Sequence, residues 1–88
     1  MKTELSPRAF RDLGSFEKRT AGRILEELAI LESPRWPGPP KIRKLTSPGN
    51  IYRLRVGEYR IIYEVQKRIA IILRIVARKD LEKALRNL

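Results

Sequence analysis

Three arginines in the stretch YRLRVGEYR, residues 52–60, have the type and spacing that fit chemistry on an anion. Arg53 and Arg55 alternate with apolar residues, and Arg60 follows a Gly-Glu pair. A guanidinium group is planar, stays protonated and donates paired hydrogen bonds to phosphate oxygens. We therefore expect these side chains to hold a phosphate and to stabilise negative charge, but not to act as bases.

The alternation also indicates the element that positions these arginines. Successive side chains of a strand point to opposite faces, so one face here is apolar and the other is cationic. Gly57 and Glu58 fit a two-residue type II′ turn. The register predicted from this turn pairs Val56 with Tyr59, Arg55 with Arg60, Leu54 with Ile61, Arg53 with Ile62 and Tyr52 with Tyr63. The three tyrosines fall on the apolar face, where we expect core residues rather than catalytic ones.

The opposed arginines need an explanation outside strand stability. Like charges at opposed positions destabilise a sheet by roughly 0.2 to 1 kcal/mol, by analogy with favourable pairs of the same geometry. The net charge of +10 is also concentrated: residues 1–40 carry 7 basic and 6 acidic groups, whereas residues 41–88 carry 13 basic and 4 acidic groups. Such a field attracts polyanions. We expect nucleic acid first, then an acidic protein, then an anionic membrane surface, with a solvated basic surface as the alternative.

Composition excludes several kinds of site. The chain has no Cys and no His, which removes disulfides, thiolate nucleophiles and the commonest metal ligands. Its ten acidic residues form no convincing carboxylate cluster in the sequence, so we expect no metal and no cofactor. No apolar run approaches the roughly 20 residues of a membrane span, and the N-terminal MKTELSPRAF lacks the apolar stretch of a signal peptide. The expectation is a cytoplasmic protein without a membrane partner.

The N-terminal part of the chain predicts a short strand, residues 2–5, and then a helical hairpin over about residues 7–32. Ser6 and Pro7 fit a helix start, Gly14 is placed to end the first helix, and Ser15 can cap the second. The apolar stripes of this hairpin should cover one face of the sheet. They consist of Ala9, Phe10, Leu13, Ile24, Leu25, Leu28 and Leu31.

A Pro-rich linker, residues 33–41, follows the helices and can be neither helix nor central strand. Trp36 in this linker is either an apolar anchor against the helices, which we favour, or a base-stacking platform. Lys41, Arg43 and Lys44 come next and add candidate RNA-binding side chains before the hairpin.

The segment IAIILRIV, residues 69–76, fits the last strand of an antiparallel sheet over about residues 51–76. A three-residue turn, 66–68, would pair Val65 with Ile69 and place Arg74 opposite Arg60 on the cationic face. It would send Ile69, Ile71, Leu73 and Ile75 to the core. A two-residue turn would bury Arg74 beside Ile61, which we reject because an unpaired buried charge is costly.

A short C-terminal helix, about residues 80–88, completes the chain, with Asp80 as its cap. The expected fold class is α+β in the order β-α-α-β-β-β. One small domain, residues 1–88, would hold an N-terminal strand and a two-helix hairpin packed on an antiparallel sheet.

These motifs resemble a known family. YRLRVGEYRIIYEV, followed by a strand and then ARKDLEKAL, is similar to the RelE/ParE superfamily of toxins from toxin–antitoxin modules. In that superfamily a YR.R.G.YR.[IV]Y hairpin precedes a strand ending in an H-R-[RK]-D-[VI]-Y-like motif. The family's basic residues fall on Arg53, Arg55, Arg60, Arg78 and Lys79, while its His is Ala77 here and its Tyr is Glu82.

The basic residues and the resemblance together leave three alternative functions. A RelE-like toxin enters the ribosomal A site, cuts mRNA and is silenced by a cognate RelB-like antitoxin, which we expect to be acidic and helical. A ParE-like toxin instead inhibits DNA gyrase by binding, and the departures at Ala77 and Glu82 give this alternative some weight. The third alternative is a basic RNA-binding protein without catalysis.

A metal-independent endoribonuclease would need groups that transfer protons, besides cations that stabilise the transition state. Arg53, Arg55, Arg60, Arg74 and Arg78 supply only positive charge. The candidates for proton transfer are Lys44 and Lys79, if neighbouring cations depress the pKa of one of them, and Glu64, which shares the face of Arg60.

Overall fold

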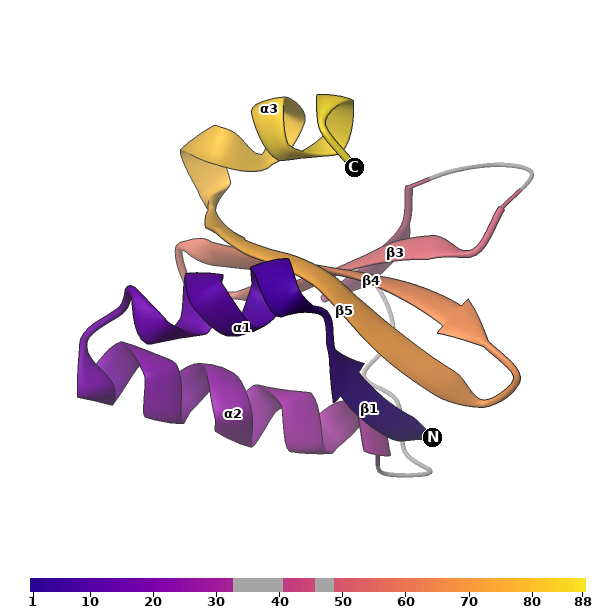
Figure 1. Ribbon diagram of the computed structural model, residues 1–88, viewed down its shortest axis with the longest axis horizontal. Helices are drawn as coiled ribbons and strands as arrows, with labels where there is room; N and C mark the ends of the chain where they lie inside the picture. Colours follow the sequence, from indigo (N-terminus) through magenta and orange to yellow (C-terminus); the bar gives the residue numbers. More distant parts are fainter. Residues whose placement is uncertain (33–40, 46–48) are drawn as a thin grey trace.

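The computed structural model describes residues 1–32, 41–45 and 49–88. Within these residues, five strands form one mixed sheet in the order β1-β5-β4-β3-β2 (Figure 1). The strands are β1 (Lys2–Leu5), β2 (Ile42–Lys44), β3 (Ile51–Val56), β4 (Tyr59–Gln66) and β5 (Ile69–Ala77). The helices are α1 (Pro7–Gly14), α2 (Lys18–Glu32) and α3 (Leu81–Arg86), and a short 3₁₀ helix, Arg78–Asp80, connects β5 to α3. The predicted α+β fold class is confirmed.

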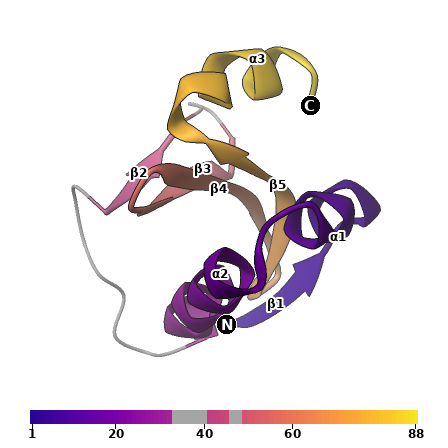
Figure 2. The same ribbon diagram turned by 90° about the vertical axis from the view of Figure 1, so that its left-hand side faces the viewer.

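The sheet is covered on both faces. The helical hairpin and α3 lie on opposite sides of it, with α1 beside β5 (Figure 2). The main core joins Ile24, Leu28 and Leu31 of α2 to apolar side chains of the sheet that include Leu54 and Tyr63. A second, smaller cluster under α3 consists of Ile62, Val76 and Ala84, with Ile51, Leu73, Leu81 and Leu85 packed against it. Helix α3 therefore seals part of the face that carries the arginines.

The helical hairpin differs from the prediction in three details. Phe10 and Leu25 are 67% and 49% exposed, because each lies one residue, about 100° around its helix, beyond the buried Ala9 or Ile24. Ser15 does not cap α2, which begins only at Lys18. Its backbone N–H instead donates to carbonyls at the end of α1, so Ser15 is the C-cap of that helix. The predicted cap at Ser6 is confirmed, since its side chain accepts a hydrogen bond from the N–H of Ala9.

The β3–β4 hairpin confirms its predicted register in every pair, including Arg55 with Arg60. Gly57 has φ +56°, as the first central position of a type II′ turn requires. Tyr52 and Tyr63 stack with ring centroids 5.5 Å apart on the core side. Tyr63 is fully buried, while Tyr52 and Tyr59 are partly buried against the core. All three tyrosines are therefore core residues.

The predicted β4–β5 turn is wrong. Gln66 pairs with Ile69, which leaves the two residues Lys67 and Arg68 in the turn, at φ 47° and 67°. A bulge then shifts the register, so that Leu73 and Arg74 both lie opposite Ile62. The two-residue turn does not bury Arg74 beside Ile61 as expected, because the bulge moves Arg74 to the position opposite Ile62. Ala70, Ile72 and Ile75 join the main core in place of the predicted Ile69, Ile71, Leu73 and Ile75 set.

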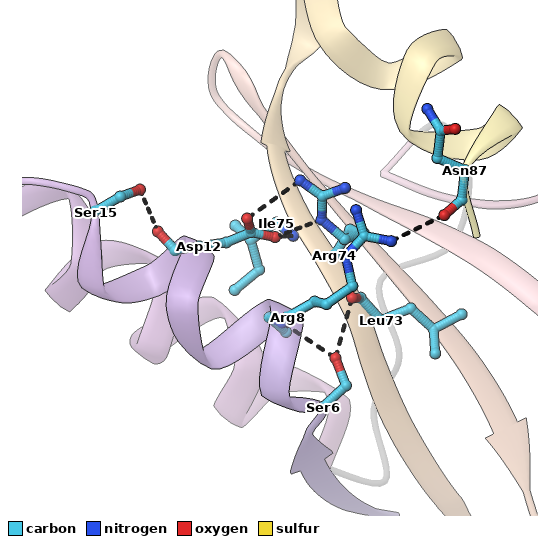
Figure 3. A network of polar contacts seen from close by, with 9 residues as sticks. Ser6, Arg8, Asp12, Ser15, Leu73, Arg74, Ile75 and Asn87 are labelled. Atoms are coloured by element: carbon cyan, nitrogen blue, oxygen red, sulfur yellow. Dashed lines mark hydrogen bonds and ion pairs between the residues drawn. The ribbon is translucent and has the colours of Figure 1, made fainter.

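Helix α1 and its N-cap residue Ser6 supply hydrogen-bond partners to the segment of β5 around this bulge (Figure 3). Ser6 Oγ donates to the carbonyl of Leu73 at 3.1 Å, and Asp12 Oδ2 accepts from the N–H of Ile75 at 2.9 Å. The same carboxylate accepts from Arg74 Nε at 2.8 Å and Nη2 at 3.2 Å. The Leu73 carbonyl and the Ile75 N–H, which follow the last β1–β5 pair, are thus satisfied by side chains 63 or more residues away in the sequence.

Three further findings concern the edges of the sheet and the C-terminus. Strand β1 pairs with β5 in parallel, so the sheet is mixed rather than antiparallel. Strand β2, which was not predicted, pairs with β3 and makes the sheet one strand wider than expected. Asp80 precedes α3 but makes no side-chain cap bond. Trp36 and most of the Pro-rich linker lie outside the described residues. None of the helices in the described part of the chain is long and apolar enough to cross a membrane.

Candidate functional site

Six basic side chains from four segments meet in one cleft on the sheet face beside α3. This cationic cleft has a volume of about 450 Å³. Its basic residues are Arg43, Arg53, Arg55, Arg60, Arg78 and Lys79, and Leu45, Leu81 and Glu82 complete its lining. The cleft therefore contains all five residues to which the family resemblance assigns a role, together with Arg43.

Strand pairing explains why these residues converge. Arg53 lies between Arg43 of β2 and Ile62 of β4, and cross-strand partners share a face. The backbone N–H of Arg78 donates to the carbonyl of Glu58 at 2.7 Å, which fixes the residue after β5 beside the hairpin turn. Helix α3 begins three residues later and brings Leu81 and Glu82 to the rim. The cleft is thus built from β2, β3, β4 and the β5–α3 connection.

Arg60 differs from the other arginines of the cleft because it is only 8% exposed. Its Nη1 donates to the carbonyls of Gly57 and Tyr59, each at 2.9 Å. These carbonyl oxygens stabilise the guanidinium within the protein, so the opposed Arg55–Arg60 pair does not depend on a bound anion alone. Arg55, in contrast, is exposed.

Electrostatics in the cleft are repulsive. Burial lowers the pKa of Arg53, and the positive charges of Arg60, Arg43 and Arg55 lower it further. Burial likewise lowers the pKa of Arg60, and the charges of Arg78 and Arg55 add to this effect, while Glu58 opposes it. A bound anion would relieve this repulsion, so the cleft favours polyanionic ligands.

The structure does not bring four other predicted site residues into the cationic cleft. Lys41 lies 2.9 Å from Glu27 in a neighbouring hollow. Lys44 is on the opposite face of the sheet, with its Nζ 6.0 Å from the ring centre of Tyr52. Arg74 forms its ion pair with Asp12, rather than lying opposite Arg60 as predicted. Glu64 accepts a hydrogen bond from Gln66 and does not line the cleft.

The half-buried ion pair with Asp12 explains why Arg74 does not contribute to the cationic cleft. Hydrogen bonding to Asp12 raises the pKa of Arg74 in spite of its burial. Both side chains are less than one fifth exposed. Arg74 therefore serves the packing of α1 on β5, and its charge is used within the protein.

Glu82 is the residue of the cleft that sequence reasoning did not single out as functional. The family resemblance marks Glu82 only as a replacement of the family's Tyr. In the structure this residue lines the cleft together with six basic residues. The signal that could have identified it is its place two residues after Asp80, at the first turn of α3. Lys79 and Glu82 are the ionisable side chains other than arginine that line the cleft within the described residues.

The described part of the chain contains no group of three or more acidic, Cys or His side chains that could hold a metal ion. The cleft itself offers two kinds of chemistry. Its guanidinium groups can bind a phosphate and stabilise a negatively charged transition state. A carboxylate and an amine at its rim can accept or donate a proton.

Comparisons with known proteins place this fold and cleft in a family. The family model for the ParE toxin of type II toxin–antitoxin systems, parDE, matches residues 3–82. No match was found among curated protein sequences.

Solved structures of toxins share the fold. The archaeal RelE–RelB complex from Pyrococcus horikoshii is 31% identical, with a TM-score of 0.72, and the match covers 88% of this chain and 93% of that one. The RelB–RelE antitoxin–toxin complex from Methanococcus jannaschii is 26% identical, with a TM-score of 0.70 and coverage of 89% and 93%. The YoeB–YefM toxin–antitoxin complex from Staphylococcus aureus is 28% identical, with a TM-score of 0.66 and coverage of 86% and 94%. The chain thus belongs to the ParE toxin family of type II toxin–antitoxin systems, within the RelE/ParE superfamily whose hairpin motif it carries.

Proposed function

We propose that this toxin is a metal-independent endoribonuclease that cuts mRNA in the ribosomal A site through the RNA 2′-hydroxyl. The observation that carries the proposal is the cationic cleft, where six basic side chains surround a space of about 450 Å³ with one carboxylate at its rim. A phosphate bound there would receive paired hydrogen bonds from arginines on three strands.

The cleft residues take separate roles in this reaction. Arg53, Arg55 and Arg78 bind the scissile phosphate and stabilise the charge that develops on it. Glu82 or Lys79 accepts the proton of the attacking 2′-hydroxyl or supplies one to the leaving oxygen. Arg43 extends the phosphate-binding surface along β2, and Arg60 supports the turn as well as the phosphate.

We also propose a cognate antitoxin as the regulatory partner. The archaeal RelE relatives are complexes with RelB, and the YoeB relative is a complex with YefM. An acidic helical protein would complement the 13 basic and 4 acidic groups of residues 41–88. A small acidic reading frame beside this gene, whose product co-purifies with the toxin, is the expected observation.

Arg55→Ala is the variant that tests the nuclease, because Arg55 is exposed and its loss should leave the fold intact. With translating ribosomes and no added metal, the wild-type protein should cut mRNA at the A-site codon. Arg55→Ala should reduce the rate by about 100-fold or more, as removal of one transition-state donor commonly does. Arg11→Ala removes an equal charge from α1, outside the cleft, and should retain the wild-type rate.

A second function remains as the alternative outcome, and the match to the ParE family model favours it. If the wild-type protein leaves mRNA intact and inhibits DNA supercoiling by gyrase, the nuclease proposal is wrong and the gyrase-inhibitor alternative replaces it.

A further inference from the structure

We infer that an RNA strand held in the cationic cleft continues over the β3–β4 turn into a second subsite, where Arg23 binds the phosphate of the adjoining nucleotide. This inference rests on the proposed binding of RNA. Arg23 lies outside the hairpin motif of the family.

A hollow of about 380 Å³ lies on the other side of the hairpin turn. It is lined by Arg23, Glu27, Lys41, Arg55, Val56, Gly57, Glu58, Arg60 and Arg78. Arg55, Arg60 and Arg78 also line the cationic cleft, so the two spaces adjoin along these three side chains. A strand bound in the first space has a charged path into the second.

The turn itself positions Arg23. A Cβ atom added at Gly57 would lie 3.1 Å from Arg23 Nη1 and 3.3 Å from its Cζ, so the guanidinium packs close against the glycine. Helix α2 thus delivers a cation to the tip of the hairpin that carries Arg55 and Arg60. Glycine is favoured at position 57 by its positive φ, and the absence of a side chain leaves room for the guanidinium.

Charges in the second hollow favour an anion near Arg23. The hollow has five basic and two acidic side chains. Lys41 Nζ lies 2.9 Å from Glu27 Oε2. Because these two side chains form an ion pair, their charges largely cancel. The ion pairs of the described residues do not include Arg23, which is exposed. Glu58, exposed on the turn, is the remaining carboxylate.

The test measures the salt dependence of binding to RNA that cannot be cut. Oligonucleotides of 2 and 8 residues with 2′-O-methyl groups serve as probes, since the blocked hydroxyl prevents cleavage. Arg23→Gln should weaken binding of the 8-mer by about 5-fold at low salt and lower the slope of log Kd against log salt by about 0.7, the value for one phosphate contact. Binding of the 2-mer, which has one phosphate, should change by less than about 2-fold.

Arg11→Gln is the matched control, since it removes the same charge from an exposed site that lines neither space. It should leave both probes close to wild type. An equal loss for the two lengths, an unchanged salt slope, or an equal effect of Arg11→Gln would overturn the subsite, as would a wild-type protein that binds neither probe.

These results are separate from those of the cleavage assay. A toxin that cuts no mRNA but shows the Arg23 effect retains the subsite and loses the nuclease. A toxin that cuts mRNA and shows no Arg23 effect retains the nuclease and loses the subsite.

Discussion

At the scale of single residues, arginines that look equivalent in the sequence have different surroundings. Arg55 and Arg60 face each other across the hairpin, but Arg60 is buried and donates to two turn carbonyls. Loss of Arg60 would therefore disturb the turn as well as the cleft, and an Arg60→Ala phenotype would mix the two effects. Arg55 is exposed, so its substitution reports on ligand binding more directly than that of Arg60.

Tyr63 gives a prediction about stability at alkaline pH. Burial raises the pKa of its hydroxyl to about 12, and the neighbouring Tyr52 adds to the shift. This pKa in the folded state exceeds the pKa of about 10 that tyrosine has in the unfolded chain. The free energy of unfolding therefore keeps its full value below pH 10 and falls as the pH rises towards 12. We expect this fall to be on the order of 2 kcal/mol in the wild type and to be absent in Tyr63→Phe, as measured by urea unfolding at several pH values.

The same variant has an expected result at pH 7. The buried Tyr63 hydroxyl has no hydrogen-bond partner within the described residues, so Tyr63→Phe should be neutral or stabilising by about 1 kcal/mol. Tyr59→Phe is the control, and it should retain the wild-type alkaline loss because Tyr63 is still present. A marked destabilisation by Tyr63→Phe at pH 7 would mean that the hydroxyl is satisfied.

At the scale of elements, α1 and the bulged segment of β5 stabilise each other. The Leu73 carbonyl and the Ile75 N–H follow the last β1–β5 pair, and Ser6 and Asp12 bind them. Asp12 also neutralises Arg74, which the bulge places on the face of Ile62. Helix α1 and its N-cap thus provide partners for two backbone groups of β5 and for the charge of Arg74.

Removal of Asp12 should therefore be costly. Asp12→Ala breaks hydrogen bonds to Arg74 and to the N–H of Ile75, and we expect a loss of about 2 kcal/mol in urea unfolding. Asp12→Asn retains an acceptor for Ile75 and should lose less. In the cycle with Arg74→Met, the double variant Asp12→Asn/Arg74→Met should be more stable than the sum of the single losses, by about 1 kcal/mol.

Arg8→Met supplies the control for this cycle, since it removes only an exposed bond to the carbonyl of Asn87 and should cost about 0.5 kcal/mol or less. Strict additivity of the Asp12 and Arg74 losses would contradict the ion pair as the reason for the effect.

At the scale of the whole molecule, the net charge is +10, and some basic side chains form ion pairs while others repel one another. Lys41 and Arg74 are paired with carboxylates, while the arginines of the cationic cleft lower one another's pKa. Repulsion of this kind opposes folding and is weakened by salt. A toxin of this family would thus carry a binding site that reduces its own stability until an anionic partner is bound.

The melting temperature of the free protein should accordingly rise between about 50 and 500 mM NaCl, because the Debye length falls from above 10 Å to a few Å. Arg55→Ala should show a smaller rise, since Arg55 contributes to the low pKa of both Arg53 and Arg60. Arg11→Ala should respond as the wild type does. A melting temperature that falls with salt would show that attractive ion pairs dominate instead.

The sequence by itself determined the β3–β4 hairpin, because a two-residue turn and strict alternation fix the register between neighbouring strands. It also determined the fold class, the cap at Ser6, the buried tyrosines and the set of arginines on one face. Each of these depends on residues that are close in the chain.

Only the tertiary structure decided the rest. The bulge at Leu73, the pairing of Arg74 with Asp12 and the parallel addition of β1 depend on contacts across 62 or more residues, which no local pattern records. The place of Glu82 depends on how β5 ends and α3 docks over Ile62. Arg23 reaches the second hollow because α2 brings its guanidinium against Gly57 at the tip of the hairpin. The hairpin fixes which side chains are cationic, and packing of distant elements decides which of those charges are left for a ligand.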